Sequence, residues 1–98
     1  TVIASGGIRY GTDVAKSLAL GASLASMALP ILYSAAKGSE EVKKTLQFVI
    51  EELRNAMFLV GAESLQKLQK TPVVLTGKTA EWLRMRGFQP ELYARRKA

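Results

Sequence analysis

The first thirty residues alternate between short apolar runs and glycine-containing turns, a pattern that few folds accommodate. Val2-Ile3-Ala4-Ser5 runs directly into Gly6-Gly7. A helix rich in Ala and Leu is then expected over residues 12–20, and a second apolar run occupies residues 22–29. This order predicts strand, glycine turn, helix and strand. A helical crossover returns the chain to the end of the sheet at which the first strand began. The two strands are therefore expected to be parallel, as in a β–α–β unit.

The turn after the first apolar run has the composition of an anion-binding loop. Because glycine has no Cβ, Gly6-Gly7 can adopt positive φ and bring the backbone close to a ligand. Successive free N–H groups in such a turn form a concave nest for an anion, and Arg9 adds a full positive charge with a planar set of donors. The other interpretation is a tight turn in which glycine serves only the backbone dihedrals, and the residues alone leave both open.

Residues 39–60 predict the longest helix of the chain. Ser39 followed by acidic residues is typical of a helix start, and Gly61 is typical of the position just past a helix end. Met57 and Phe58 are interpreted as core residues rather than cofactor contacts. Apolar residues recur at helical spacing and predict one buried face: Val42, Leu46, Val49, Ile50, Leu53, Met57 and Val60.

The remaining residues predict shorter elements. Short helices are expected over 31–36 and 63–69, an extended apolar segment over 73–76, and a last helix over 79–86. Residues 89–98 are polar and basic, and predict a frayed tail.

The residue types that are missing exclude several kinds of chemistry. The chain has 98 residues with no cysteine and no histidine, so disulfides, thiolate chemistry and Ser-His or Cys-His catalytic pairs are excluded. The acidic residues are dispersed, and the neighbours Glu51 and Glu52 point about 100° apart on a helix. They are interpreted as part of a solvated face, so no catalytic or metal-binding residue is expected in this chain.

The chain is basic, with a formal net charge of +6, and most of the excess lies after residue 71. Arg84, Arg86 and Arg95-Arg96-Lys97 support an alternative function, a small module that binds nucleic acid or another anionic surface. A charge run is more often a solvated tail, and the few aromatic residues are scattered. We therefore expect no nucleic-acid partner, although the alternative stays open.

One uncharged stretch has the nominal length of a membrane span. Residues 17–36 carry no charge, and a span needs about 20 apolar residues. Gly21, Pro30 and several serines within the stretch argue against an inserted helix. A strand buried on both faces also reads as a continuous apolar run, so no membrane association is expected.

Several strings of residues resemble a known enzyme family. SGGIRYGTDVAKSLALGAS, followed by MALP, is similar to the seventh and eighth βα units of FMN-dependent TIM barrels. Other flavin barrels commonly have Gly-Arg-Pro after the eighth strand, where this chain has Ala28-Leu29-Pro30. That departure, together with EELRNAMFLVGAESLQKLQKTPVVLTG and EWLRMRG, resembles more closely the C-terminal region of archaeal type 2 isopentenyl diphosphate isomerases. The resemblance covers nearly the whole chain.

The resemblance implies an α/β fold class: the last two βα units of a TIM (β/α)8 barrel plus C-terminal helices. A complete barrel needs about 250 residues, so the chain is expected to be a fragment of a single FMN-binding barrel domain. The organisation implied is a β–α–β unit with the phosphate site over 1–38, a helical region over 39–88 and a basic tail over 89–98.

The resemblance also implies a function for the parent protein. The family interconverts isopentenyl diphosphate and dimethylallyl diphosphate with reduced FMN, with Mg²⁺ on the diphosphate and NADPH to keep the flavin reduced. No ligand for Mg²⁺ or NADPH is expected in this chain, which should be inactive alone, and the parent is expected to be a cytoplasmic homo-oligomer. Backbone N–H groups around Gly6, Gly7, Arg9, Ala28 and Leu29 are expected to hold the FMN phosphate. The cofactor-binding residues implied are Gly6, Gly7, Ile8, Arg9, Ala28 and Leu29.

Overall fold

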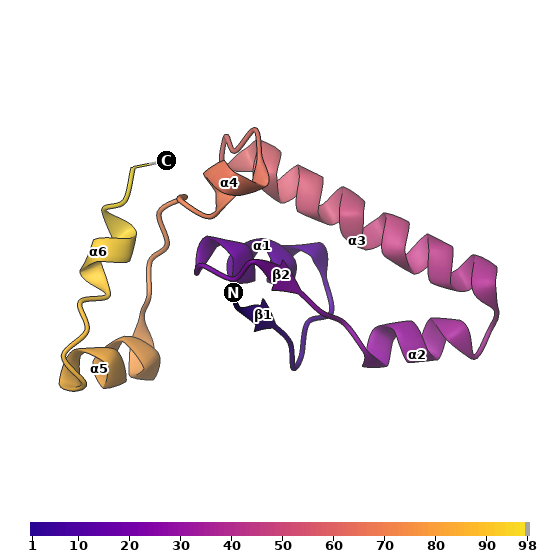
Figure 1. Cartoon of the computed structure of the whole chain (residues 1–98), viewed down its shortest axis with the longest axis horizontal. Coiled ribbons are helices and arrows are strands. Elements are labelled where there is room, and N and C mark those ends of the chain that lie inside the picture. The colour runs from indigo at the N-terminus through magenta and orange to yellow at the C-terminus, as the bar shows by residue number, and fades with distance from the viewer. Residues whose placement is uncertain (98) are drawn as a thin grey trace.

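The structure is a computed structural model that describes residues 1–97, and it is dominated by helices with one small sheet (Figure 1). Its elements are, in chain order, β1 (Ile3–Ala4), α1 (Gly11–Ala19), β2 (Leu24–Ala25), α2 (Leu29–Ala35), α3 (Ser39–Leu59), α4 (Leu65–Leu68), α5 (Gly77–Met85) and α6 (Glu91–Ala94).

The sheet consists of β1 and β2, which are parallel and joined by α1. Ile3 pairs with Leu24 and Ala4 with Ala25, so both carboxyl ends point the same way (Figure 1). The sequence predicted a second strand over residues 22–29, but only Leu24–Ala25 is strand. The ladder is short because the described residues provide a partner on one side of each strand only, and residues 26–28 turn away toward α2.

The long helix α3 is the platform on which α1 and α2 lie (Figure 1). The N-cap residue of α3 is Gly38 rather than Ser39. The helix ends before Gly61, whose φ of 75° explains the need for glycine there. The predicted apolar face is only partly covered. Val49 is buried, whereas Leu46 and Ile50 are 45% and 48% exposed. Because α1 and α2 together cover one narrow side, the rest of the face meets solvent.

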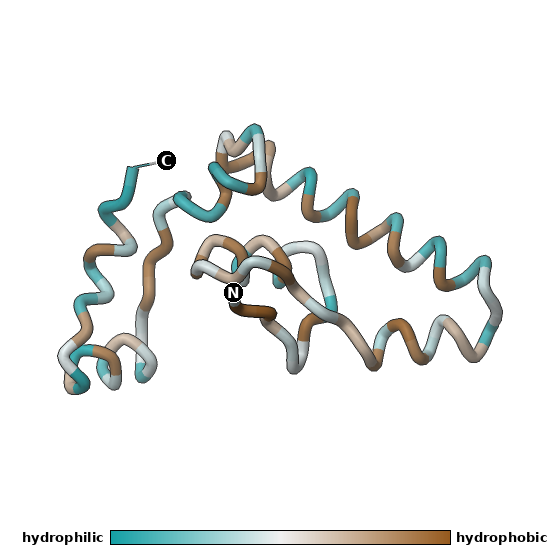
Figure 2. The backbone as a smooth tube through the Cα atoms, viewed as in Figure 1, coloured by the Kyte–Doolittle hydropathy of each residue, from teal (hydrophilic) through white to brown (hydrophobic). Residues whose placement is uncertain are grey.

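Two further details of the predicted packing are wrong. Phe58, expected in the core, is 84% exposed, and Val60 at the end of the predicted face is 52% exposed. Trp82 and Phe88, in and just after α5, are each 59% exposed as well. Phe58 and Val60 lie at the C-terminal end of α3, and Trp82 and Phe88 lie in or just after α5. Figure 2 shows that hydrophobic residues alternate with hydrophilic ones in both regions.

The core is correspondingly small. No large side chain is fully buried in the described chain, and the Cα radius of gyration is 15.2 Å, against about 13 Å for a compact domain of 100 residues. The remaining apolar side chains would be buried only if a further protein surface packed against them. The buried cluster consists of Ala15, Leu18, Ala62 and Leu68, with Val14, Leu53, Ala56 and Met57 packed against it.

The C-terminal residues form an arm, α5 and α6, that is joined to the rest by residues 71–76 (Figure 1). The predicted frayed tail is wrong for residues 91–94, which form α6, and for Arg96, which is bound to the rest of the chain; Ala98 lies outside the described residues. Arg96 Nη2 donates to the carbonyl oxygens of Ala19 at 2.6 Å and Thr71 at 2.5 Å, and its Nη1 donates to that of Gln69 at 3.1 Å. The guanidinium also lies over Tyr93, 4.9 Å from the ring centroid. Arg96 therefore fastens the arm to the ends of α1 and α4.

The uncharged stretch over residues 17–36 is divided between the end of α1, β2 and α2. Among the helices of residues 1–97, none combines the length and the hydropathy that a membrane span requires.

Candidate functional site

The carboxyl ends of β1 and β2 open onto one hollow of about 230 Å³, called here the strand-end hollow. The loop after β1 forms one wall and the loop between β2 and α2 forms the other. Both walls meet at one edge because the strands are parallel. All six residues that the sequence nominated are thus brought together. The lining consists of Ser5, Gly6, Gly7, Ile8, Arg9, Ser26, Ala28, Leu29 and Pro30.

The first wall depends on its two glycines. Gly6 and Gly7 have φ of 85° and 90°, a region that side-chain-bearing residues rarely adopt. A Cβ built on either glycine would meet no atom within 4 Å, so the space above the loop is open. Within residues 1–97, no protein acceptor meets the backbone N–H groups of Gly6, Gly7 and Ile8. Consecutive unpaired N–H groups in this conformation form an anion-binding nest.

The second wall comes from the start of α2. The sequence predicted this helix from Ile31, but it begins at Leu29, with Pro30 in its first turn. In the described chain the backbone N–H groups of Ala28 and Leu29 have no protein acceptor, and no side chain caps this helix. The N–H of Ser26 is instead used in the sheet, where it donates to Ala4 O at 2.8 Å. Two further N–H donors therefore border the hollow.

One predicted donor is already occupied. The backbone N–H groups of Arg9 and Tyr10 both donate to Asp13 Oδ2, each at 3.1 Å. The Arg9 N–H is therefore engaged within the chain, and the role of Arg9 at an anion site stays a prediction that would depend on its guanidinium. The N-cap residue of α1 is Tyr10, and the Asp13 carboxylate accepts from the segment before the helix.

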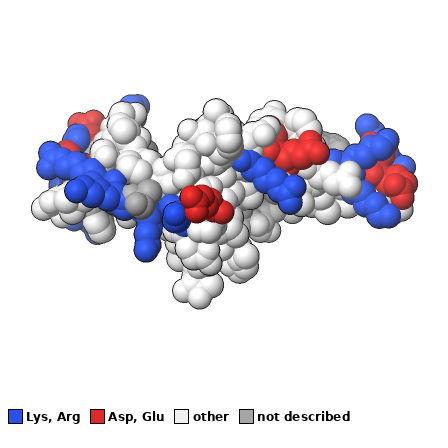
Figure 3. All heavy atoms as spheres, turned by 90° about the horizontal axis from the view of Figure 1, so that it is seen from above, with Lys and Arg blue, Asp and Glu red and all other residues white. Residues whose placement is uncertain are grey.

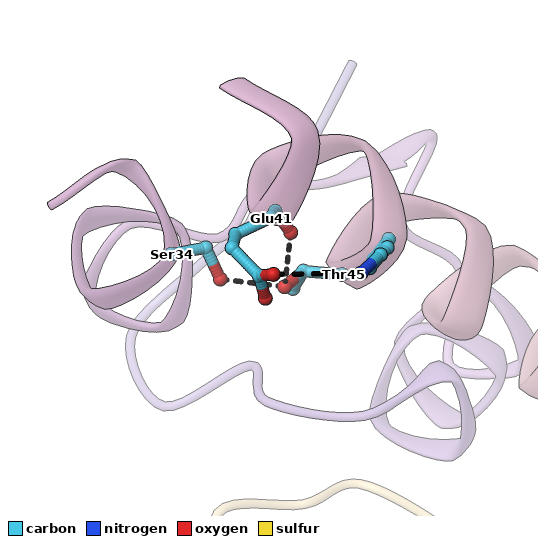
Figure 4. Close-up of polar contacts among 4 residues, drawn as sticks. Ser34, Glu41 and Thr45 are labelled. Carbon is cyan, nitrogen blue, oxygen red and sulfur yellow. Dashed lines mark hydrogen bonds and ion pairs between the residues drawn. The ribbon is translucent and has the colours of Figure 1, made fainter. Parts of the chain in front are cut away.

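Both walls are attached to α3 by polar contacts that the sequence did not indicate. Glu52 Oε1 accepts from the backbone N–H of Gly11, the first residue of α1, at 3.1 Å. The hydroxyls of Ser34 on α2 and Thr45 on α3 lie 2.5 Å apart (Figure 4). Glu52 was assigned to a solvated face, but it is only half-exposed. The sequence did contain an indication of these contacts. Thr45 and Glu52 are four residues before and three residues after Val49, and therefore lie on the same face of α3 as this buried residue.

A larger groove of about 460 Å³ lies between α1 and the segment 71–75. Its walls are mostly apolar, and it lies away from the residues that line the strand-end hollow. Within the part of the chain that the structure describes, no three His, Cys, Asp or Glu residues gather as a metal site would require. The strand-end hollow is therefore the better candidate for a site that recognises a polar ligand.

The basic residues nominated for an anionic surface are partly engaged within the chain. Arg84 pairs with Glu91 at 2.5 Å, Arg86 lies 5.8 Å from the ring centroid of Trp82, and Arg96 is bound to carbonyl groups. On the face shown in Figure 3, basic and acidic groups lie side by side at both ends of the molecule. A continuous basic stripe, the usual feature of a nucleic-acid interface, is not seen on that face.

Comparison with known proteins places these features in a family. Residues 1–75 match the family model described as FMN-dependent dehydrogenase. The chain is 54% identical over 95 residues to a Methanothermobacter thermautotrophicus protein named isopentenyl-diphosphate delta-isomerase, covering 97% of this chain and 27% of the relative. Proteins of the same name from Pyrococcus furiosus and Thermococcus kodakarensis are 54% and 55% identical over 86 residues, covering 87% of this chain and 22% and 23% of the relatives.

The chain thus spans about a quarter of the length of the curated relatives that it matches. The matched residues 1–75 include both walls of the strand-end hollow and the whole of α3. On this match, the chain belongs to the FMN-dependent dehydrogenase family.

Proposed function

We propose that these residues form the FMN-phosphate-binding part of a flavin-dependent isopentenyl-diphosphate delta-isomerase. The observation that carries the proposal is the convergence of two loops with unpaired backbone N–H groups on one hollow. The names of the relatives supply the reaction. Gly6, Gly7, Ile8, Ala28 and Leu29 would offer backbone donors, and the Arg9 guanidinium would add a positive charge.

The residues present fit a phosphate group. Among residues 1–97, no acidic side chain lines the strand-end hollow, and a fully charged phosphate is favoured where several N–H dipoles point at it. The open space above Gly6 and Gly7 allows the phosphate oxygens to approach the backbone closely. The volume of about 230 Å³ is below the roughly 300–1,000 Å³ of complete small-molecule sites. The hollow therefore suits one end of a cofactor, with the remainder bound elsewhere.

The rest of the cofactor would be held by further βα units of a TIM barrel. Parallel strands are normally covered on both faces, yet Ile3 and Leu24 are each 58% exposed. We therefore propose that β1 and β2 are two adjacent strands of a closed barrel and that α1 and α3 belong to its outer ring. In this proposal residues 1–38 carry the phosphate site, 39–88 the outer helices and 89–98 the basic end.

When bound, reduced FMN would supply the proton-transfer chemistry of the allylic shift. The residues of this chain would bind and orient its phosphate. Mg²⁺ and NADPH are proposed for the whole enzyme, and no residue here is assigned to either. Because the hollow would hold only the phosphate end of FMN, and the groups that cover the flavin and move protons would come from other barrel units, we expect the chain alone to be colourless and without turnover. The homo-oligomer stays a prediction.

The test is Gly7→Val in the full-length enzyme, with Gly87→Val as a matched control. Gly7 and Gly87 have φ of 90° and 87°, and a Cβ on either would meet nothing within 4 Å. Both variants therefore carry a similar backbone strain, of about 1–2 kcal/mol, but only one lies in the hollow. Flavin content per protein and thermal unfolding are measured. We expect Gly7→Val to lose FMN and Gly87→Val to retain it; full FMN retention by Gly7→Val would refute the proposed site.

A further inference from the structure

Two side chains on one face of α3 reach to the two walls of the strand-end hollow. Thr45 and Glu52 are seven residues apart, which is close to two turns of an α-helix and places them in line along the axis. Thr45 contacts α2, which follows the second wall, and Glu52 contacts the start of α1, which follows the first wall. A single rigid helix therefore connects both loops.

The Glu52 contact is made where the start of α1 closely approaches the backbone of α3. Gly11 is buried, and a Cβ on it would lie 2.5 Å from Glu52 Cβ and from Leu53 N. Glycine is therefore required here by the close approach of α1 to α3. The carboxylate of Glu52 then accepts from the Gly11 N–H at 3.1 Å. Only Ile8, Arg9 and Tyr10 separate this anchored residue from Gly7, so the anchor limits where the glycine loop can lie.

The Thr45 contact acts on the other wall through a helix. Ser34 Oγ lies 2.5 Å from Thr45 Oγ1, and Thr45 Oγ1 lies 3.0 Å from the Glu41 carbonyl oxygen (Figure 4). Ser34 Oγ also lies 3.2 Å from the Pro30 carbonyl oxygen. Ser34 is five residues beyond Leu29 on α2. Because a helical turn is stiff, fixing Ser34 on α3 also fixes the backbone donors at Ala28 and Leu29.

We propose that Thr45 and Glu52 are positioning residues that hold the two phosphate-binding loops at the separation one phosphate group needs. This inference rests on the proposed function, since it assigns these residues to the same site. Neither side chain lines the hollow, so both act through the backbone that they anchor. Asp13 has a related task on the first loop, where its carboxylate takes the N–H groups of Arg9 and Tyr10. In this loop, the backbone N–H groups of Gly6, Gly7 and Ile8 would then be the ones that bind the anion.

The experiment compares FMN with riboflavin, which lacks the phosphate, in the full-length enzyme. The variants are Glu52→Ala, Glu52→Gln and Thr45→Val, and the control is Glu51→Ala, the exposed neighbour of Glu52. Glutamine keeps the acceptor and the shape of glutamate without its charge, so the comparison of Ala with Gln at position 52 isolates the hydrogen bond. Valine keeps the shape of threonine without its hydroxyl. The dissociation constants of both flavins are measured by titration of the apoprotein.

We expect Glu52→Ala to weaken FMN binding by about fivefold relative to Glu52→Gln, the size of one hydrogen bond to a neutral acceptor. Thr45→Val should weaken FMN binding by about fivefold, as for one neutral hydrogen bond. Riboflavin binding should be unchanged in both variants. A merely structural role would weaken the two flavins equally, because general destabilisation does not depend on the phosphate.

The outcomes separate this inference from the proposed function. If Gly7→Val leaves the ratio of FMN to riboflavin affinity unchanged, the phosphate site itself is misplaced. If Gly7→Val lowers that ratio while Glu52→Ala and Thr45→Val leave it at the value of the Glu51→Ala control, the positioning role is refuted and the site stands. The Thr45→Val variant is nearly isosteric and keeps the test decisive if Glu52→Ala fails to fold.

Discussion

Replacing Arg96 with Met should release the C-terminal arm without unfolding the rest of the protein. Arg96 makes three hydrogen bonds to carbonyl oxygens at the ends of α1 and α4. Each bond to a charged group contributes about 1.5–3 kcal/mol to stability. Methionine, however, avoids the cost of several kcal/mol for taking the guanidinium out of water, and this offsets part of the loss. The Nε atom is buried without a partner in the described chain, which adds to that cost. The net loss should be about 2 kcal/mol.

The assay is amide hydrogen exchange at Val73. Its N–H donates to Tyr93 O at 3.0 Å and reports directly on whether α6 is docked. A loss of 2 kcal/mol corresponds to about 30-fold faster exchange. Arg95→Met is the control, because Arg95 is an exposed neighbour, and the Ala22 N–H, bonded to Ser17 O at 3.0 Å, reports on the body. Unchanged protection at Val73 in Arg96→Met would refute the reasoning, as would an equal loss at Ala22.

Two further predictions concern the long helix and the arm. Leu53 is half-buried against the core cluster, so Leu53→Ala should lower the free energy of unfolding by about 2 kcal/mol, the low end for a buried leucine. Leu46 is 45% exposed, so Leu46→Ala should lower the free energy of unfolding clearly less than Leu53→Ala, as measured by urea titration of both variants. Equal losses would contradict the division of this apolar face into a buried and an exposed part. A hydrogen bond from its own backbone N–H, followed by the hydrogen bond from Arg84, lowers the pKa of Glu91. Because this pKa is lower in the folded state, ionised Glu91 contributes to the free energy of unfolding above the usual glutamate pKa of about 4.3. That stabilisation is lost as the pH falls through the lowered pKa. Glu91→Gln should remove that part of the pH dependence, and identical pH profiles for parent and variant would contradict it.

The positions of turns and of the longest helix were readable from sequence because their causes are local. Gly6, Gly7 and Gly61 adopt positive φ, which glycine tolerates wherever the chain must turn. The apolar spacing and the flanking glycines of α3 likewise depend on neighbours within a few residues. The residues of the strand-end hollow were found in the same way, from a strand–glycine–helix pattern and the resemblance that it carried.

Only the tertiary structure decided which polar side chains do more than face solvent. Glu52 looked like half of an exposed acidic pair, and Arg96 like part of a frayed basic tail. Their partners are 41 and 77 residues away, at Gly11 and Ala19. No local pattern encodes such contacts, because they exist only after α1 has packed on α3 and the arm has folded back. The same applies to burial along α3. Helical spacing identifies an apolar face, but the elements that pack against it decide that Val49 is covered and Ile50 is not.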